Sequence, residues 1–159
     1  MTRTVLVTGA GSGLGLTISR HLWQLGYQVA MADIAIDIAC EGARQIDADR
    51  RRLLPLALDI REPEHFHAAL AQIDERFGGL DVLVNNAALT LTTPIMEISV
   101  EEFDRVTSTN LRGTFLAVRL LAVILVNADR ATLSISPRWR DKTAAPPPAP
   151  IMQPRKAAF

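Results

Sequence analysis

Apolar positions along residues 1–122 follow two alternating spacings. Short apolar runs rich in β-branched residues predict four strands, at 4–8, 27–32, 53–58 and 80–84. Apolar residues three or four positions apart predict a helix after each run, at 14–25, 35–50, 63–77 and 99–121. Pro63 stands where a first helical turn accepts proline, and Ser99 with Glu102 forms a capping box. Gly26 and Gly78 stand where helices stop.

The predicted strands and helices alternate strictly, and the strands are apolar on both faces. This pattern is typical of a parallel sheet with helices on either side. We therefore predict an α/β protein with a doubly wound parallel sheet, the Rossmann fold, whose ligand crevice lies at the carboxyl ends of the strands. The pattern stops near residue 122, so we expect the fold to be incomplete after about the fourth strand and its following helix.

Composition narrows the possible partners of the chain. Its 159 residues are 48% hydrophobic and 21% charged, which suits one globular domain. Seventeen basic residues balance 17 acidic ones, so no overall charge attracts nucleic acid or an anionic membrane. The single cysteine, Cys40, excludes an internal disulfide, and His65 and His67 lie on diverging helix faces, so no metal site is expected. No apolar run reaches the roughly 18 residues of a membrane span, and we expect a cytoplasmic protein.

The composition changes near residue 122. Residues 1–122 carry 11 basic and 15 acidic side chains, whereas residues 123–159 carry six and two. All nine glycines lie at or before Gly113, and six of the nine prolines lie at or after Pro137. Because proline removes backbone donors and blocks helix, we predict a folded domain over 1–122 and a poorly ordered Pro- and Arg-rich tail over 123–159.

A glycine-rich loop, Thr8–Gly15, follows the first predicted strand and opens the first helix. Glycines let the backbone turn sharply and approach a pyrophosphate, whose charge meets the free N–H groups of the helix N-terminus. A flexible turn without a ligand is the alternative. The residues assigned to phosphate binding are Gly9, Ser12, Gly13, Leu14 and Gly15.

Asp33 ends the second predicted strand, 18 residues after Gly15. A carboxylate at this position can accept hydrogen bonds from both hydroxyls of an adenosine ribose and would repel a 2′-phosphate. Neither Ser12 nor Ile34 is basic, so neither could hold such a phosphate. The sequence therefore predicts NAD as the cofactor rather than NADP, and the alternative is a solvated aspartate at a strand end.

Four motifs resemble those of the short-chain dehydrogenase/reductase family, over residues 3 to about 122. They are the TGxxxGxG loop Thr8–Gly15, the pair Asp59-Ile60, the NNAG-like run Asn85–Ala88, and Asn110. The resemblance implies hydride transfer between NAD(H) and a carbonyl or secondary alcohol of a small molecule. It also implies that Asp59 and Ile60 contact adenine, and that Asn110 belongs to the catalytic set.

The resemblance further implies that Asn86, Ala87 and Ala88 line the inner half of the cofactor site, although glycine is usual in place of Ala88. Members of the family form homo-oligomers, an assembly that is doubtful for this chain.

The family's catalytic tyrosine has no counterpart at the expected place. The resemblance implies that a tyrosine protonates or deprotonates the substrate oxygen and that a lysine follows it four residues later. The only tyrosine, Tyr27, begins the second predicted strand, on the wrong side of the fold, and Met152 stands four residues before Lys156. Lys156 remains a candidate catalytic residue beside Asn110. We therefore expect a fragment that is inactive as written, or a cofactor-binding module without catalysis.

The tail has the length of the missing catalytic segment. If the codons are read from their third base, those for residues 151–156 can encode Tyr-Ala-Ala-Ser-Lys. In the same shifted frame, the codons for residues 134–140 can encode a segment that resembles the family's serine-bearing strand. A frameshift between about Leu121 and Asp129 would explain both, and a diverged tail with its own function is the rival hypothesis. Without later strands to cover them, several apolar side chains are expected to be exposed: Leu116, Leu120, Leu121 and Ile124.

Overall fold

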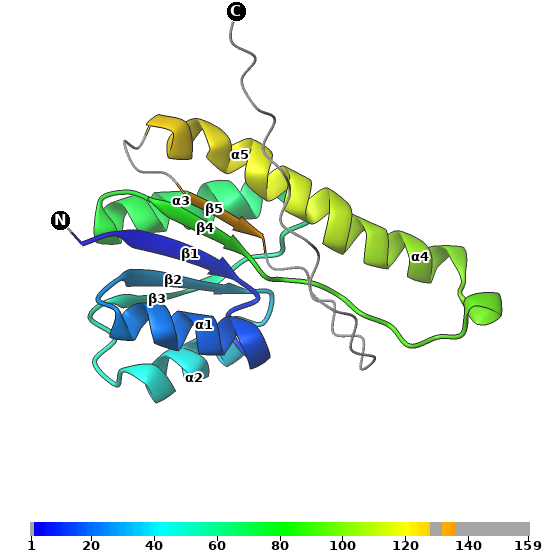
Figure 1. Ribbon diagram of the computed structural model, residues 1–159, viewed down its shortest axis with the longest axis horizontal. Coiled ribbons are helices and arrows are strands. Elements are labelled where there is room, and N and C mark those ends of the chain that lie inside the picture. Colours follow the sequence, from blue (N-terminus) through cyan, green and yellow to red (C-terminus); the bar gives the residue numbers. More distant parts are fainter. Residues whose placement is uncertain (1, 128–131, 136–159) are drawn as a thin grey trace, which may run out of the picture.

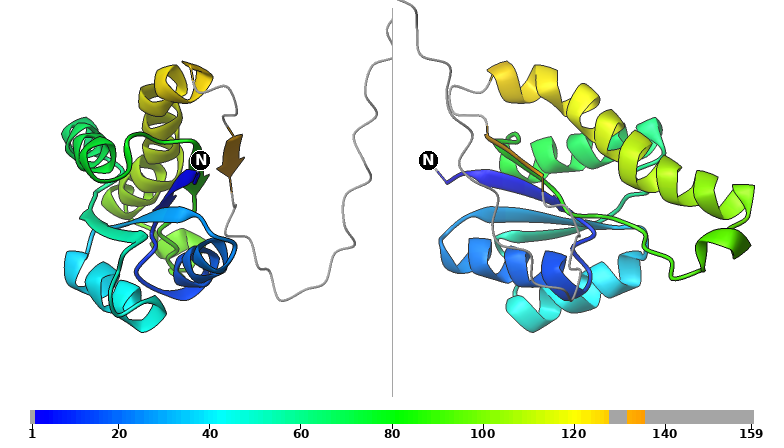
Figure 2. Two further views of the ribbon diagram at one scale, coloured as in Figure 1. Left: turned by 90° about the vertical axis from the view of Figure 1, so that its left-hand side faces the viewer. Right: turned by 45° about the vertical axis from the view of Figure 1, so that its right-hand side comes forward.

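The computed structural model describes residues 2–127 and 132–135, which form a parallel sheet between two layers of helices (Figures 1 and 2). The described strands are β1 (Thr4–Thr8), β2 (Gln28–Asp33), β3 (Leu53–Ala57), β4 (Val82–Asn85) and β5 (Thr132–Ile135). They lie in the order β3-β2-β1-β4-β5, and each neighbouring pair is parallel. The predicted doubly wound parallel sheet is therefore confirmed.

Helices cover both faces of the sheet, as the apolar strands require. The helices α1 (Gly13–Gln24) and α2 (Ile36–Ile46) lie on one face, and α3 (Pro63–Phe77) and α5 (Thr114–Asn127) on the other (Figure 1). Phe66 of α3 is fully buried in the same apolar core as Leu6 and Leu83 of the sheet. Burial of one such side chain contributes about 1.5–3 kcal/mol, so the two apolar layers hold the helices against the sheet.

Most predicted boundaries agree with the structure to within two residues. The helix α3 spans the predicted residues, and Gly78 ends it in the left-handed conformation, at φ 79°. The helix α2 ends four residues earlier than predicted, because the chain turns between Asp47 and Arg50, where Arg50 has φ 47°. Arg52, in this turn, is half-buried and donates hydrogen bonds to the carbonyls of Trp23 and Tyr27.

The last predicted helix contains a widened turn. It consists of α4 (Val100–Thr107), the π-helical segment η2 (Ser108–Gly113) and α5, after a short 3-10 turn, η1 (Ile95–Glu97). The predicted capping box of Ser99 and Glu102 is present. The helix α4 lies on the side of the molecule to which the strands point (Figure 1).

The expected exposure of the last helix is partly wrong. Leu121 is fully buried in the core with α3, and Leu116 and Leu120 are half-buried against the same core. These side chains are covered because α5 packs along α3 and β4 (Figure 1). The side chain of Ile124 lies outside the described ones.

The strand β5 extends the sheet beyond the four strands expected from the sequence. It pairs with β4, with Leu133 opposite Leu83 and Ile135 opposite Asn85. The helix α5 also passes the boundary expected near residue 122 and ends at Asn127. The rest of the tail, including Lys156 and the segment of the proposed second reading frame at 151–156, lies outside the described residues.

Candidate functional site

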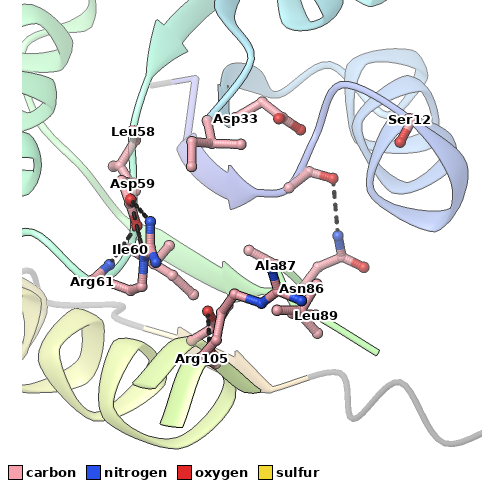
Figure 3. A pocket seen from close by; sticks show the side chains of 14 residues that line it. Ser12, Asp33, Leu58, Asp59, Ile60, Arg61, Asn86, Ala87, Leu89 and Arg105 are labelled. Carbon is pink, nitrogen blue, oxygen red and sulfur yellow. Dashed lines mark hydrogen bonds and ion pairs between the residues drawn. The ribbon is translucent and has the colours of Figure 1, made fainter. Parts of the chain in front are cut away.

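A cavity of about 380 Å³ lies at the carboxyl ends of the strands (Figure 3). It is where a doubly wound sheet places its ligand, because the loops that leave the strand ends diverge to opposite faces. Eight of the predicted site residues line it: Gly9, Ser12, Asp33, Asp59, Ile60, Asn86, Ala87 and Ala88.

The remaining predicted residues do not line the cavity. Gly13, Leu14 and Gly15 form the first turn of α1. Asn110 lies in η2, and Lys156 lies outside the described residues.

The glycine loop requires glycine for two different reasons. Gly9 has φ 64° and Gly13 has φ 54°, a backbone conformation that other residues rarely adopt. Gly15 requires glycine because of space: a Cβ there would lie 2.0 Å from the carbonyl oxygen of Gly9 and 2.6 Å from Nδ2 of Asn86. The loop thus brings the N-terminus of α1 close to β1, and Ser12, the residue that precedes the helix, lines the cavity.

Thr8 and Asn86 bind the ends of β1 and β4 to each other. Oγ1 of Thr8 accepts hydrogen bonds from the backbone N–H groups of Asn86 and Ala87, each at 3.1 Å. Nδ2 of Asn86 in turn donates to the carbonyls of Thr8 and Gly9, at 3.0 and 3.1 Å. Both residues are buried, so these bonds fix the wall of the cavity. Thr8 was not among the predicted site residues, although it opens the glycine motif.

Asp33 holds the glycine loop as well as facing the cavity. Its Oδ2 accepts from the Gly11 N–H at 3.0 Å, and its Oδ1 accepts from the Ala35 N–H at 3.1 Å. A Cβ at Gly11 would lie 2.9 Å from both Asp33 Oδ2 and Ile38 Cγ2. Gly11 therefore belongs to the site, because only glycine leaves room there for Asp33 and Ile38. Its position within the glycine-rich loop could have indicated this role from the sequence.

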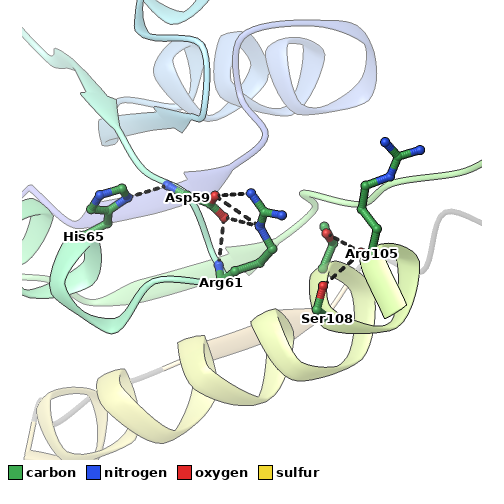
Figure 4. A network of polar contacts seen from close by, with 6 residues as sticks. Asp59, Arg61, His65, Arg105 and Ser108 are labelled. Atoms are coloured by element: carbon green, nitrogen blue, oxygen red, sulfur yellow. Dashed lines mark hydrogen bonds and ion pairs between the residues drawn. The ribbon is translucent and has the colours of Figure 1, made fainter. Parts of the chain in front are cut away.

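Asp59 is paired with an arginine that the sequence reading did not single out. Arg61 donates to both carboxylate oxygens of Asp59, and the backbone N–H of Asp59 donates to Nδ1 of His65 (Figure 4). The hydrogen bonds from the Arg61 side chain hold the pKa of Asp59 below its usual range. The carboxylate at this edge of the cavity is thus ionised at neutral pH.

Arg105 extends from α4 across the cavity from Asp33 (Figure 3). Its guanidinium makes no hydrogen bond or ion pair with any residue in the described part of the chain. Arg105 and Thr109 come from a helix far along the sequence, and no local pattern marked them. Of the two arginines that line the cavity, Arg61 is therefore paired with Asp59, whereas the guanidinium of Arg105 faces solvent.

Asn110 does not face the cavity but holds the loop that does. Its Nδ2 donates to the Leu89 carbonyl and its Oδ1 accepts from the Leu89 N–H, both at 2.8 Å. The widened turn of η2 carries this side chain, a common use of π-helical segments near functional sites. Gly113, at the end of η2, has no room for a Cβ, which would lie 2.8 Å from the side chain of Ile60.

Other kinds of site are not found in the described part of the chain. No group of three or more His, Cys, Asp or Glu residues there could hold a metal ion. None of the described helices is both long and apolar enough to cross a membrane. Tyr27 directly precedes β2, six residues before Asp33, and so lies at the amino ends of the strands, whereas the cavity lies at their carboxyl ends.

Comparison with known proteins agrees with this geometry. A family described as short chain dehydrogenase matches residues 3–133. A short-chain dehydrogenase/reductase of Armillaria gallica is 36% identical over 119 residues, which cover 74% of this chain and 46% of that protein. L-2,3-butanediol dehydrogenase of Corynebacterium glutamicum is 31% identical over 121 residues, covering 75% of this chain and 47% of that enzyme.

A solved structure shares the fold. The crystal structure of a 3-ketoacyl-(acyl-carrier-protein) reductase from Brucella melitensis complexed with NADH superposes with a TM-score of 0.72 at 32% identity. The match covers 77% of this chain and 50% of the reductase. The chain thus spans about half the length of the relatives it matches.

Proposed function

Because this chain belongs to the short-chain dehydrogenase/reductase family, we propose that its cavity binds NAD(H). The observation that carries the proposal is the approach of Gly15 to Gly9 and Asn86, which leaves no space for a Cβ and brings the N-terminus of α1 to the cavity edge. Backbone N–H groups at such a terminus bind the pyrophosphate of a dinucleotide. Asp33 lines the same cavity and offers a carboxylate to a ribose.

The order of the strands supports one orientation of the dinucleotide. The described strands lie in the order β3-β2-β1-β4, and a dinucleotide has its parts in the order base, ribose, pyrophosphate, nicotinamide nucleoside. With the pyrophosphate at the loop after β1 and the ribose at Asp33 after β2, the adenine meets Asp59 and Ile60 after β3. The nicotinamide half then meets Asn86, Ala87 and Ala88 after β4.

NAD is the proposed form of the cofactor. The carboxylate of Asp33 would repel a 2′-phosphate on the ribose that it binds. Ser12 and Ile34, which line the cavity beside it, carry no positive charge. The Brucella melitensis reductase was crystallised with NADH, which supports the same choice.

The family's reaction is hydride transfer between NAD(H) and a carbonyl or secondary alcohol. Bound NAD(H) would supply the hydride acceptor or donor at nicotinamide C4. We propose a small alcohol or ketone as substrate, in line with the name of the butanediol dehydrogenase relative. Within this chain, Asn110 positions Leu89 at the cavity wall rather than facing the cavity.

A second candidate function is binding of the cofactor without turnover. It is favoured by Tyr27, the one tyrosine of the sequence, which lies at the end of the strands opposite the cavity and cannot protonate a substrate there. We propose that the chain as given binds NADH but does not oxidise alcohols.

Titration of the purified chain with NADH, followed by its fluorescence, tests both candidates. We expect saturable binding, and Asp33→Ala should weaken it about tenfold or more because the ribose hydroxyls and the Gly11 N–H lose their acceptor. Asp37→Ala, in the exposed first turn of α2, is the matched control and should leave binding unchanged. A folded chain without NADH binding would refute the proposal, and NAD-linked turnover of an alcohol would refute the second candidate alone.

A further inference from the structure

Gly113 and Ile60 lie against each other where the helix that follows β4 meets the wall of the cavity. Gly113 ends η2 and is buried. A Cβ added to it would lie 2.8 Å from both Cγ1 and Cδ1 of Ile60, and 3.2 Å from the Ile60 carbonyl oxygen. Ordinary van der Waals contact begins at 3.4 Å, so the Ile60 side chain occupies the space that any other residue at position 113 would need.

The helical segment around Gly113 is anchored and cannot easily move away from Ile60. Before Gly113, the side chain of Asn110 is joined to the backbone N–H and carbonyl of Leu89 by two hydrogen bonds of 2.8 Å. After Gly113, Ala117 and Leu121 of α5 are fully buried in the core that α5 shares with α3. Polar contacts therefore hold the segment on one side of Gly113, and apolar packing holds it on the other.

The backbone on either side of Ile60 is also held, so its side chain is the part that can yield. The Asp59 carbonyl accepts from the Glu62 N–H at 3.1 Å, and Oδ1 of Asp59 accepts from the Arg61 N–H at 2.9 Å. Ile60 is only 6% exposed, within the core of the sheet, and it also lines the cavity (Figure 3). Because a close-packed core has no spare room, the displaced side chain of Ile60 would turn towards the cavity.

We propose that Gly113 is a positioning residue for the cofactor, because the absence of a side chain there keeps Ile60 out of the base-binding end of the cavity. The inference rests on the proposed function, which puts the adenine beside Ile60 at the end of β3. A larger residue at position 113 would turn Ile60 into the space of the base. The resulting loss of affinity should grow with the size of the base, since the pyrophosphate and the nicotinamide half bind at the ends of β1 and β4.

The experiment compares NADH with reduced nicotinamide cytosine dinucleotide, which carries a smaller pyrimidine in place of adenine. Both fluoresce through the reduced nicotinamide, so each dissociation constant can be measured directly. We expect the wild type to bind NADH about tenfold more tightly, because the larger base buries more surface. Gly113→Ala should weaken NADH binding about tenfold and binding of the cytosine form at most about threefold, since the displaced Ile60 meets the larger base first.

Ile60→Val should rescue the binding of NADH. Valine lacks Cδ1, which is one of the two side-chain atoms in the way of a Cβ at position 113. In the double variant, Gly113→Ala with Ile60→Val, the affinity for NADH should return to within about threefold of the wild-type value. If Gly113→Ala alone does not fold, the double variant carries the test, because less of the Ile60 side chain has to move.

Ala117→Val is the matched control for added bulk in the same core. Ala117 lies one helical turn after Gly113, is fully buried in the core cluster that contains Ile60, and does not line the cavity. Overpacking there should lower the melting temperature. The ratio of the two dissociation constants should stay at the wild-type value, since the added methyl groups do not reach the base. Melting curves of all variants establish which of them are folded.

The outcomes separate the two proposals. If the folded wild type binds neither dinucleotide, the proposed function fails and the role of Gly113 fails with it. If NADH binds but Gly113→Ala keeps the wild-type affinities, or weakens both ligands equally, the proposed function stands and the role of Gly113 is overturned. The inference is also overturned if Ile60→Val restores no affinity, if the double variant does not fold, or if Ala117→Val changes the ratio as Gly113→Ala does.

Discussion

The carbonyl oxygen of Gly9 lies so close to Gly15 that a Cβ on Gly15 would be 2.0 Å from it. Two backbone segments, the end of β1 and the first turn of α1, are in direct contact at this point. Gly15→Ala should therefore lower the free energy of unfolding by about 2 kcal/mol or more, since neither backbone can give way cheaply. It should also abolish NADH binding, because the helix N-terminus moves away from the cavity.

Gly78 provides the control for that substitution. It has φ 79° but nothing lies within 4 Å of a Cβ added there, and asparagine tolerates this conformation. Gly78→Asn should leave NADH binding unchanged and cost less than about 1 kcal/mol in urea unfolding. Normal NADH affinity in Gly15→Ala would contradict the role given to the glycine contact.

Asn110 is predicted to stabilise the wall of the cavity through Leu89. Asn110→Ala removes two hydrogen bonds of 2.8 Å and leaves the N–H and carbonyl of Leu89 without side-chain partners. We expect the free energy of unfolding to fall by about 1–3 kcal/mol, and the Leu89 amide to exchange faster with solvent. Thr107→Ala, which removes an exposed bond to the Phe103 carbonyl on the same helix, should change stability by less than about 0.5 kcal/mol.

The Asp59–Arg61 pair should make stability depend on acid pH. Arg61 depresses the pKa of the Asp59 carboxyl in the folded protein, so the pair stabilises the fold above the unfolded pKa of about 4. This contribution is lost as the pH falls through the lower, folded pKa. Urea unfolding of the wild type and Arg61→Ala should therefore show a difference at about pH 6 that shrinks towards pH 3. A difference that stays constant over this range would argue against the ion pair as its source.

Arg52 is predicted to stabilise the end of α1. Its Nη1 donates to the carbonyls of Trp23 and Tyr27, at 2.8 and 3.1 Å, and its guanidinium lies 5.1 Å from the centre of the Trp23 ring. Arg52→Ala should cost about 2 kcal/mol in urea unfolding, because charged donors to carbonyls are the stronger hydrogen bonds.

Arg51→Ala is the matched control for Arg52, since Arg51 is 82% exposed and pairs only loosely with Asp49. It should cost less than about 0.5 kcal/mol. Both variants should bind NADH as the wild type does, because this turn lies at the amino ends of the strands. Equal stability of the two variants would contradict the capping role of Arg52.

The sequence by itself determined the alternation of strands and helices, the helix boundaries at Pro63 and Gly78, and the glycine loop after β1. These features depend on the spacing of apolar residues and on the local backbone freedom of glycine and proline, and both can be read along the chain. The same local logic pointed to Asp33, which ends a buried strand, whereas Asn86 was assigned from the resemblance of the run Asn85–Ala88 to a family motif.

Only the tertiary structure decided which groups these residues contact. Thr8 and Asn86 are 78 positions apart, Asn110 is 21 positions from Leu89, and Leu121 is buried because α5 packs along α3. Such contacts depend on strand order, register and helix packing, and no local window of sequence contains both partners. Even the pair Asp59 and Arg61, two residues apart in the sequence, lines a cavity only because the folded sheet brings the end of β3 next to the ends of β1, β2 and β4.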